Sequence, residues 1–431
     1  MGEKIPRKVL FAVILINFAG QIAWAVENQY YNVFMYNVIA PVPLYISILV
    51  AVTTIVGTIA AIIMGSYSDV KAKRKTIIFV SFIFWGITTA MFPLAAFFRP
   101  IILAVLIAIL FDSIMTFFGS TAMNAGFNAY VTDVTTEENR GKVMGIVQVM
   151  FIIALLITYG ISGFFIQVYG YFAYFYIVGI VVGSIGIIGA FLIEDSEDLK
   201  PLNISIYVHI KNTFKGGVLK DHKDYIKLLV SVAVLETGFY VFFPFLLIYL
   251  EHYVGLSLSM ASILIFIALL VSMLLGYPFG ILADRVGRKK MAIASALMMG
   301  FFLLIFAFVL DVFLLVILGT CWFTFYFAWT IATLTWIKDL YPEESRGQFS
   351  GYWNLFNATI PMVIGVFFGG WLALQYGIPI ERGGITGTVP TPLIFIVGAI
   401  IVLFSIIPHL FVKDIWGTES ENLNMADSRK E

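Results

Sequence analysis

The sequence predicts an all-α membrane protein with twelve transmembrane helices in two pseudo-symmetric halves of six helices each. Three observations carry this prediction: the composition, a series of long apolar runs, and two loop motifs that occur once in each half. The chain has 431 residues, of which 61% are hydrophobic and only 12% are charged. Because so few charges could not cover the surface of a water-soluble protein of this length, lipid must surround much of the chain.

A membrane-spanning helix needs roughly 20 mainly apolar residues. Runs of this kind lie at residues 9–38, 43–68, 76–98, 100–132, 143–167, 171–193, 225–253, 257–283, 291–311, 312–337, 349–377 and 392–412. A hydrophilic linker separates the first six runs from the last six. The predicted domains are an N-terminal half (1–193), the linker (194–224), a C-terminal half (225–413) and a polar tail (414–431). The linker is either a solvated tether or a segment that lies on the inner leaflet.

The loop after the second run of each half carries the same motif. Its copies are residues 65–75 and 280–290, and the spacing of glycine, aspartate and basic residues is the same in both. The second copy has the form Gly-x-x-x-Asp-x-x-Gly-Arg-Lys, which resembles the cytoplasmic loop signature of the major facilitator superfamily. In the first copy Ala72 replaces the second glycine and Val70 replaces the usual arginine.

A second motif supports the division into halves. Residues 133–141 match residues 339–347 in the pattern Asp-x-x-x-Glu-Glu-x-Arg-Gly, and both segments follow the fourth run of their half. The resemblance implies two six-helix repeats around a central cavity lined by helices 1, 4, 7 and 10, and a transporter that works by alternating access. It also implies cytoplasmic gates at Asp69, Arg74, Glu137, Glu138 and Arg140, and at Asp284, Arg285, Arg288, Glu343, Glu344 and Arg346. The alternative is that these charges only fix the topology.

The basic residues predict the orientation in the membrane. Of the 26 lysines and arginines, 24 lie in the terminal segments, the linker and alternate loops, against only Arg99 and Arg382 on the other side. Cytoplasmic loops carry such an excess, so we expect a multi-pass protein of the cell membrane with both termini in the cytoplasm. The net charge of zero gives no reason to expect a nucleic-acid partner. The single cysteine, Cys321, excludes an intrachain disulfide and a multi-cysteine metal site.

Three acids lie deep in predicted spans: Glu27 in helix 1, Asp112 in helix 4 and Glu236 in helix 7. Ionisable groups are costly there and usually functional. Burial favours the neutral form of a carboxyl group, so such an acid can take up and release a proton as its exposure changes. These three residues are the candidates for proton coupling, although sodium could use the same acids.

Polar side chains recur on the same helices at steps of three or four residues. In helix 4, for example, Asp112, Thr116, Ser120, Asn124 and Asn128 are each four apart. Such a stripe must face the bundle interior, where it either binds substrate or holds helices together. The candidate substrate-binding residues are Asn17, Gln21, Trp24, Asn28, Tyr31, Asn124, Asn128, Tyr240, Asn354 and Asn357. A tryptophan row at 322, 329 and 336 is better explained by packing between helices.

The sequence therefore predicts a secondary transporter. No basic residue lies deep in a span to bind an anion, which favours neutral or cationic substrates. The polar and aromatic residues of the cavity and the acid of helix 4 resemble those of sugar–cation symporters, so we expect proton-coupled symport of a sugar or another neutral polar solute. The main alternative is a proton-coupled exporter of hydrophobic cations. A receptor or scaffold on a transporter fold, or a membrane-embedded enzyme, is a weaker explanation because the gate motifs are present and a nucleophile–base set is lacking. The expected partners are a small-molecule substrate, a coupling ion (a proton rather than sodium) and the lipid bilayer, for a monomer without cofactor or metal.

Overall fold

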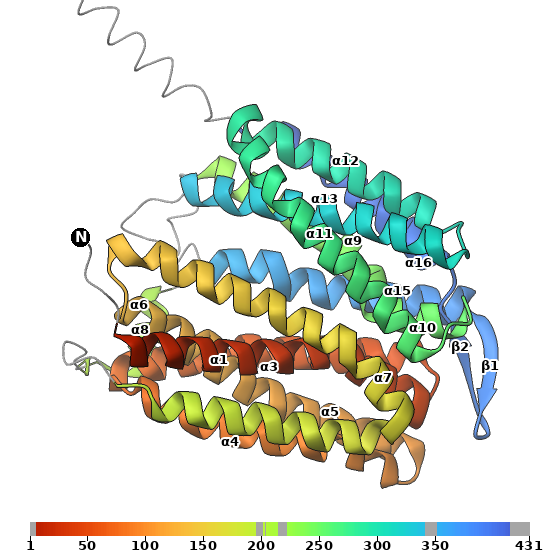
Figure 1. Ribbon diagram of the computed structural model, residues 1–431, viewed down its shortest axis with the longest axis horizontal. Helices are drawn as coiled ribbons and strands as arrows, with labels where there is room; N and C mark the ends of the chain where they lie inside the picture. The colour runs from red at the N-terminus through yellow and green to blue at the C-terminus, as the bar shows by residue number, and fades with distance from the viewer. Residues whose placement is uncertain (1–5, 195–200, 203, 214–221, 341–350, 414–431) are drawn as a thin grey trace, which may run out of the picture. The chain divides into compact units, whose positions relative to one another are not determined.

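The computed structural model describes residues 6–194, 201–202, 204–213, 222–340 and 351–413, which are mostly helical (Figure 1). Helices satisfy their own backbone hydrogen bonds, which is what a membrane interior without water requires. Among the described residues, 11 helical stretches are long and apolar enough to cross a membrane. The longest, Asn139–Phe191, has a break at Gly170 (φ 82°, ψ 167°), between the predicted fifth and sixth spans. The all-α fold and the predicted set of spans are confirmed.

In chain order the elements are α1 (Arg7–Val26), η1 (Glu27–Tyr31), α2 (Asn32–Phe34), η2 (Met35–Ile39), α3 (Pro43–Lys71), α4 (Arg74–Met91), η3 (Phe92–Phe97), α5 (Ile101–Ser120), η4 (Thr121–Phe127), α6 (Asn128–Asp133), α7 (Glu137–Phe191), α8 (Ile206–Thr213), α9 (Lys223–Phe242), η6 (Phe243–Phe245), α10 (Leu246–His252), α11 (Leu258–Val286), α12 (Arg288–Phe306), α13 (Val312–Asp339), η8 (Leu355–Thr359), α15 (Ile360–Tyr376), β1 (Ile378–Arg382), β2 (Ile385–Val389), α16 (Leu393–Phe404) and α17 (Ile406–Leu410).

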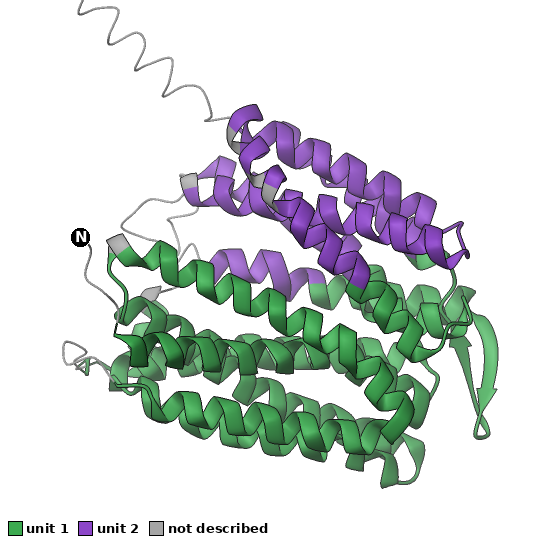
Figure 2. Cartoon of the chain, viewed as in Figure 1, with its two compact units in different colours: residues 1–214, 241–266, 362–394 green, residues 215–240, 267–361, 395–431 purple. Residues whose placement is uncertain are grey.

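The chain forms two compact units (Figure 2). Unit 1 comprises residues 1–214, 241–266 and 362–394, and unit 2 comprises residues 215–240, 267–361 and 395–431. In unit 1, α1 and α4 pack against α7, and α3 packs against α5. The units do not coincide with the predicted halves, because two segments of the second half pack with the first. The division into halves at the linker therefore stays a prediction.

A two-stranded antiparallel hairpin, β1–β2, lies in unit 1 (Figure 1). Its turn is Gly383–Gly384, and both residues have positive φ (57° and 76°). Two-residue hairpin turns of this kind require positive φ at both central positions, which glycine adopts without strain. The hairpin occupies the segment between the predicted spans 349–377 and 392–412, for which the apolar pattern predicts no element. We call the end of unit 1 at which this hairpin lies the hairpin end.

The structure explains the second glycine of the repeated loop motif. Gly287, before α12, has φ 98°, a left-handed conformation that glycine adopts without strain. In the first copy Ala72 follows α3 with φ 54°, so a residue with a Cβ occupies a left-handed position. The motif therefore requires a sharp helix end, and the first copy makes that end with the less suitable residue.

We expect Ala72→Gly to stabilise the protein by about 1 kcal/mol, because glycine removes the steric cost of the left-handed conformation. A shift in the thermal unfolding midpoint of the purified protein measures this change. Ala61→Gly, inside the same helix, is the matched control and should destabilise by about 1 kcal/mol. If both substitutions lowered the midpoint equally, the strain assigned to Ala72 would be wrong.

Candidate functional site

Several candidate residues lie where their helices are irregularly wound. The π-helical segments are η1 with Glu27, Asn28 and Tyr31, η4 with Asn124, and η8 with Asn357. A π-helical turn contains an extra residue, so it changes the direction of the side chains that follow, and such turns are frequent at functional sites. The sequence predicted these polar positions but not the irregular winding.

Two of the predicted acids are close together in unit 1. Thr116 Oγ1 donates a hydrogen bond to Glu27 Oε1 at 2.8 Å, which joins η1 to α5. Asp112 lies one helical turn before Thr116 and is only 2% exposed. Glu27 Oε2 and Asp112 Oδ1 are buried and have no hydrogen-bond partner among the described residues. Buried polar atoms are normally paired, so this acid site, Glu27–Thr116–Asp112, has capacity for a proton or a cation.

The third acid lies in unit 2. Glu236 is 2% exposed and accepts hydrogen bonds from Tyr326 Oη at 3.2 and 3.4 Å. Tyr240 follows it by one turn of α9 and is half-buried. Within the described part of the chain, Glu27, Asp112 and Glu236 take part in no ion pair. Each unit thus contains at least one buried acidic side chain that forms no ion pair with a described basic residue.

The polar stripe of α1 divides into two groups. Asn17 is buried and donates to the Val147 carbonyl at 2.7 Å, so it holds α1 against α7. Tyr31 is also buried, and its ring stacks on Phe92 with the ring centres 3.9 Å apart. The other three residues of the stripe are half-buried: Gln21, Trp24 and Asn28. The first group packs helices together, and the second could contact a solute.

The remaining substrate candidates differ in exposure. Asn124, Asn128 and Asn354 are exposed and Asn357 is half-buried. The tryptophans at 322, 329 and 336 are fully buried, as a packing role requires. Whether these asparagines bind a solute stays a prediction.

The gate residue Arg74 lies at the centre of an ion-pair cluster within unit 1. Its guanidinium contacts Asp69 at 2.7 Å and Asp133 at 3.0 Å, and it donates to Ser68 Oγ at 2.6 Å. Asp133 was absent from the predicted gate, although it begins the second repeated motif. The cluster joins the ends of α3, α4 and α6.

The other predicted gate residues are described less completely. Arg140 donates to Thr135 Oγ1 at 3.2 Å, Arg285 is exposed and Arg288 is half-buried. The side chains of Glu137, Glu138 and Asp284, and all of Glu343, Glu344 and Arg346, lie outside the described residues. Their gating role stays a prediction.

Three amides of the first span that were not among the predicted site residues contact other segments: Gln29, Asn32 and Asn37. Gln29 Nε2 donates to the Phe243 carbonyl at 2.9 Å, and Asn32 Nδ2 donates to the Pro244 carbonyl at 3.5 Å. Asn37 bonds to several other segments at the hairpin end. The available signal was their presence in an apolar run, where an amide needs a partner.

Comparison with known families now identifies the fold. The model of the Major Facilitator Superfamily matches residues 9–208 and 228–427, which is most of the chain. The chain belongs to the Major Facilitator Superfamily. The matched family and the solved structures described below are those of multi-pass membrane transporters, as the loop motif had implied.

Solved transporters of this superfamily share the fold. A mutant of the nucleoside transporter NupG aligns with TM-score 0.73 at 13% identity, covering 93% of this chain and 99% of that one. A bacterial homologue of the human lysosomal transporter Spinster, in an inward-facing and occupied conformation, aligns with TM-score 0.71 at 14% identity over 95% and 97% of the two chains. The xylose transporter XylE from E. coli aligns with TM-score 0.66 at 13% identity over 94% and 100%. At these identities the similarity concerns the fold.

Two superfamily members are similar in sequence over part of the chain. A Na(+), Li(+), K(+)/H(+) antiporter of Planococcus maritimus is 32% identical over 174 residues, 37% of this chain and 38% of the antiporter. Multidrug resistance protein 2 of Bacillus subtilis is 25% identical over 246 residues, 56% of this chain and 61% of that protein. The matched regions thus span less than two thirds of either relative.

The Arg74 cluster gives a test of the first-half gate. Arg74→Gln should destabilise the protein by about 2 kcal/mol. This loss is smaller than for removing one partner of a fully buried ion pair, because water partly solvates Asp69 and Asp133. The two carboxylates would then face each other without a cation. Thermal unfolding measures the loss, and Lys71→Gln, an exposed charge on the same loop, is the control. Equal midpoints for the two variants would show that the cluster contributes nothing.

Proposed function

We propose that this transporter exchanges protons for a cation by alternating access, with Glu27 and Asp112 as the exchange site. The observation that supports the proposal is the acid site in unit 1, where Thr116 bonds Glu27 one helical turn from Asp112. Glu236 supplies a second buried acid in unit 2. Protonation changes at such residues are the usual way in which membrane transporters use a proton gradient.

The acid site cannot hold two free carboxylates at low cost. Two neighbouring negative charges repel each other, and burial removes the water that would solvate them. A proton or a cation relieves both penalties, and the unpaired oxygens of Glu27 and Asp112 are available to either. Competition between proton and cation for the same oxygens is the physical basis of exchange.

The substrate class follows from the same charges. A cation is attracted to the site, whereas an anion would need a basic partner. The antiporter of Planococcus maritimus and the multidrug resistance protein of Bacillus subtilis are consistent with this class by their names. Their similarity covers only part of each protein, so it supports the proposal without deciding between metal and organic cations.

The second candidate is proton-coupled symport of a sugar or another neutral polar solute. The observation that favours it is the half-buried group formed by Gln21 and Trp24 on α1 and Asn28 on η1. An aromatic ring beside amides can stack on a sugar and hydrogen-bond its hydroxyls. In that case the acid site carries only the coupling proton, and sodium is the alternative coupling ion.

We also propose the orientation. The basic residues place both termini on the cytoplasmic side of the cell membrane, and Arg382 in β1 then places the hairpin end outside. The Arg74 cluster lies at the opposite, cytoplasmic end and serves as a gate in this scheme. We take the functional unit to be a monomer.

One liposome experiment separates the two candidates. The purified protein is reconstituted with a pH-sensitive dye inside the vesicles, and Na⁺, K⁺, tetraphenylphosphonium, xylose or a nucleoside is added outside. Entry of a cation by exchange expels protons, so the interior becomes more alkaline. Entry of a neutral solute by symport brings protons in, so the interior becomes more acidic. A signal that is equal in protein-free vesicles would refute both.

Glu27→Gln should reduce the proton flux at least about tenfold, because the amide keeps the shape of the acid but carries no exchangeable proton. Glu194→Gln is the matched control. Glu194 is an exposed acid outside the spans, and its hydrogen bond and attraction to Lys8 lower its pKa. A normal flux in Glu27→Gln would remove Glu27 from the mechanism.

A pair of substitutions at Thr116 tests the hydrogen bond itself. Thr116→Ser keeps the hydroxyl and should retain most of the flux. Thr116→Val keeps the shape but loses the hydrogen-bond donor. A hydrogen bond to a charged group contributes about 1.5 kcal/mol, so its loss should reduce the proton flux by about tenfold. The same liposome assay measures both, and equal fluxes would contradict a role for the bond.

A further inference from the structure

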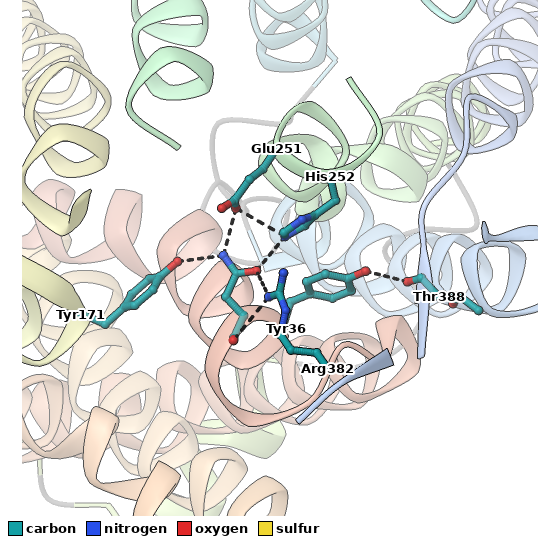
Figure 3. A network of polar contacts seen from close by, with 7 residues as sticks. Tyr36, Tyr171, Glu251, His252, Arg382 and Thr388 are labelled. Atoms are coloured by element: carbon teal, nitrogen blue, oxygen red, sulfur yellow. Dashed lines mark hydrogen bonds and ion pairs between the residues drawn. The ribbon is translucent and has the colours of Figure 1, made fainter. Parts of the chain in front are cut away.

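The hairpin end of unit 1 holds a network of polar side chains (Figure 3), in which Asn37 bonds to four of the others. Asn37 Nδ2 donates hydrogen bonds to Tyr171 Oη and to Glu251 Oε2, both at 2.9 Å. Asn37 Oδ1 accepts from Arg382 Nη1 at 2.9 Å and lies 2.7 Å from His252 Nε2. The amide group therefore uses all its donors and acceptors.

Backbone contacts seat the β1–β2 hairpin beside this network. Tyr36 Oη donates to the Thr388 carbonyl at 2.8 Å, and the Thr388 amide donates to the Pro41 carbonyl at 3.0 Å. A Cβ added to Gly387 would lie 1.8 Å from the Pro41 carbonyl oxygen, so only glycine allows β2 to approach this closely. The tight turn makes the hairpin a compact unit that carries Arg382 on β1 to Asn37.

The network joins segments from both sides of the linker. Asn37 and Tyr171 precede the linker, whereas Glu251, His252 and Arg382 follow it. The Asn37 amide also bridges opposite charges, because its nitrogen faces Glu251 and its oxygen faces Arg382. This order of charge, amide and charge strengthens each hydrogen bond. No apolar side chain could replace Asn37 in this arrangement.

Alternating access requires that each end of the transporter opens in turn. We propose that the β1–β2 hairpin is a latch: the hydrogen bond between Arg382 and Asn37 holds the hairpin end closed, and it breaks when that end opens. Asn37 and Arg382 are half-buried, so water can replace their hydrogen bonds as the parts separate. The latch rests on membership of the superfamily and on these contacts, and it does not depend on the exchanged ion.

A single reporter cysteine can measure opening of this end. Ser47 of α3 is fully buried, and its Oγ donates to the Val366 carbonyl of α15 at 2.7 Å. In the proposed mechanism, the contact between α3 and α15 separates when the hairpin end opens. Ser47→Cys is therefore placed in a Cys321→Ser background, because Cys321 is the only native cysteine. The full chain in lipid nanodiscs is then treated with a charged methanethiosulfonate reagent.

Arg382→Gln and Asn37→Leu should each raise the labelling rate of the Ser47→Cys reporter by about tenfold or more, which corresponds to about 1.4 kcal/mol in favour of the open end. Arg99→Gln is the matched control. It removes the other basic residue of the same predicted side, whose guanidinium donates, among the residues that the structure describes, to the nearby Ala96 and Phe98 carbonyls. Its labelling rate should equal that of the parent.

The latch is refuted if Arg382→Gln labels at the parent rate, or if Arg99→Gln accelerates labelling equally. Should Asn37→Leu fail to fold, Gly387→Ala takes its place, since it unseats β2 from Pro41 and leaves the Asn37 side chain intact. Gly387→Ala should accelerate labelling of the reporter as Arg382→Gln does. An unchanged labelling rate would contradict a role for the contact between β2 and Pro41. Because labelling needs no substrate, a negative transport result leaves this test valid.

Discussion

A chain that spans a membrane has no water for its backbone, so wherever a helix breaks, the freed groups need partners from elsewhere in the protein. This constraint explains the amides of the first span. The 3₁₀ turn at Phe243–Phe245 interrupts the seventh span at Pro244, and the carbonyls of residues 243 and 244 accept hydrogen bonds from Gln29 and Asn32. Polar side chains that would be costly in lipid are therefore placed where another segment needs them.

The acids of unit 1 fall into two kinds. Asp69 and Asp133 share Arg74, a cation that the chain supplies, and they join the ends of three helices. Glu27 accepts a hydrogen bond from Thr116, and neither Glu27 nor Asp112 forms an ion pair with a basic residue among the described residues. A fixed cation makes a structural site, because neither charge needs to change during transport. A site without one must take its positive charge from outside, which is the condition for exchange.

Features that are local or periodic in the sequence could be predicted. The spans, the break near Gly170 and the acids Glu27, Asp112 and Glu236 depend on composition and spacing within one segment. Thr116 contacts Glu27, which is 89 positions away in the sequence, and Asn37 contacts Arg382, which is 345 positions away. No spacing within a single segment encodes such a contact. Gly383–Gly384 is a turn signal for the hairpin, but the apolar pattern that marks the spans does not mark its two short strands.

The first span has two unlike faces, and this difference decides which of its contacts can open. Toward its own half it packs by aromatic rings, with Tyr31 stacked on Phe92 and Phe34 edge-on to Phe175. Toward the segments after the linker it makes hydrogen bonds through Gln29, Asn32 and Asn37. Two further amide hydrogen bonds, from Asn17 to Val147 and from Asn37 to Tyr171, stay within its own half. Separating packed rings exposes apolar surface, which is costly. A hydrogen bond exchanged for one to water costs little net free energy. In the proposed alternating-access mechanism, the hydrogen bonds toward the segments after the linker are therefore the contacts that separate, and the first span moves with the predicted N-terminal half.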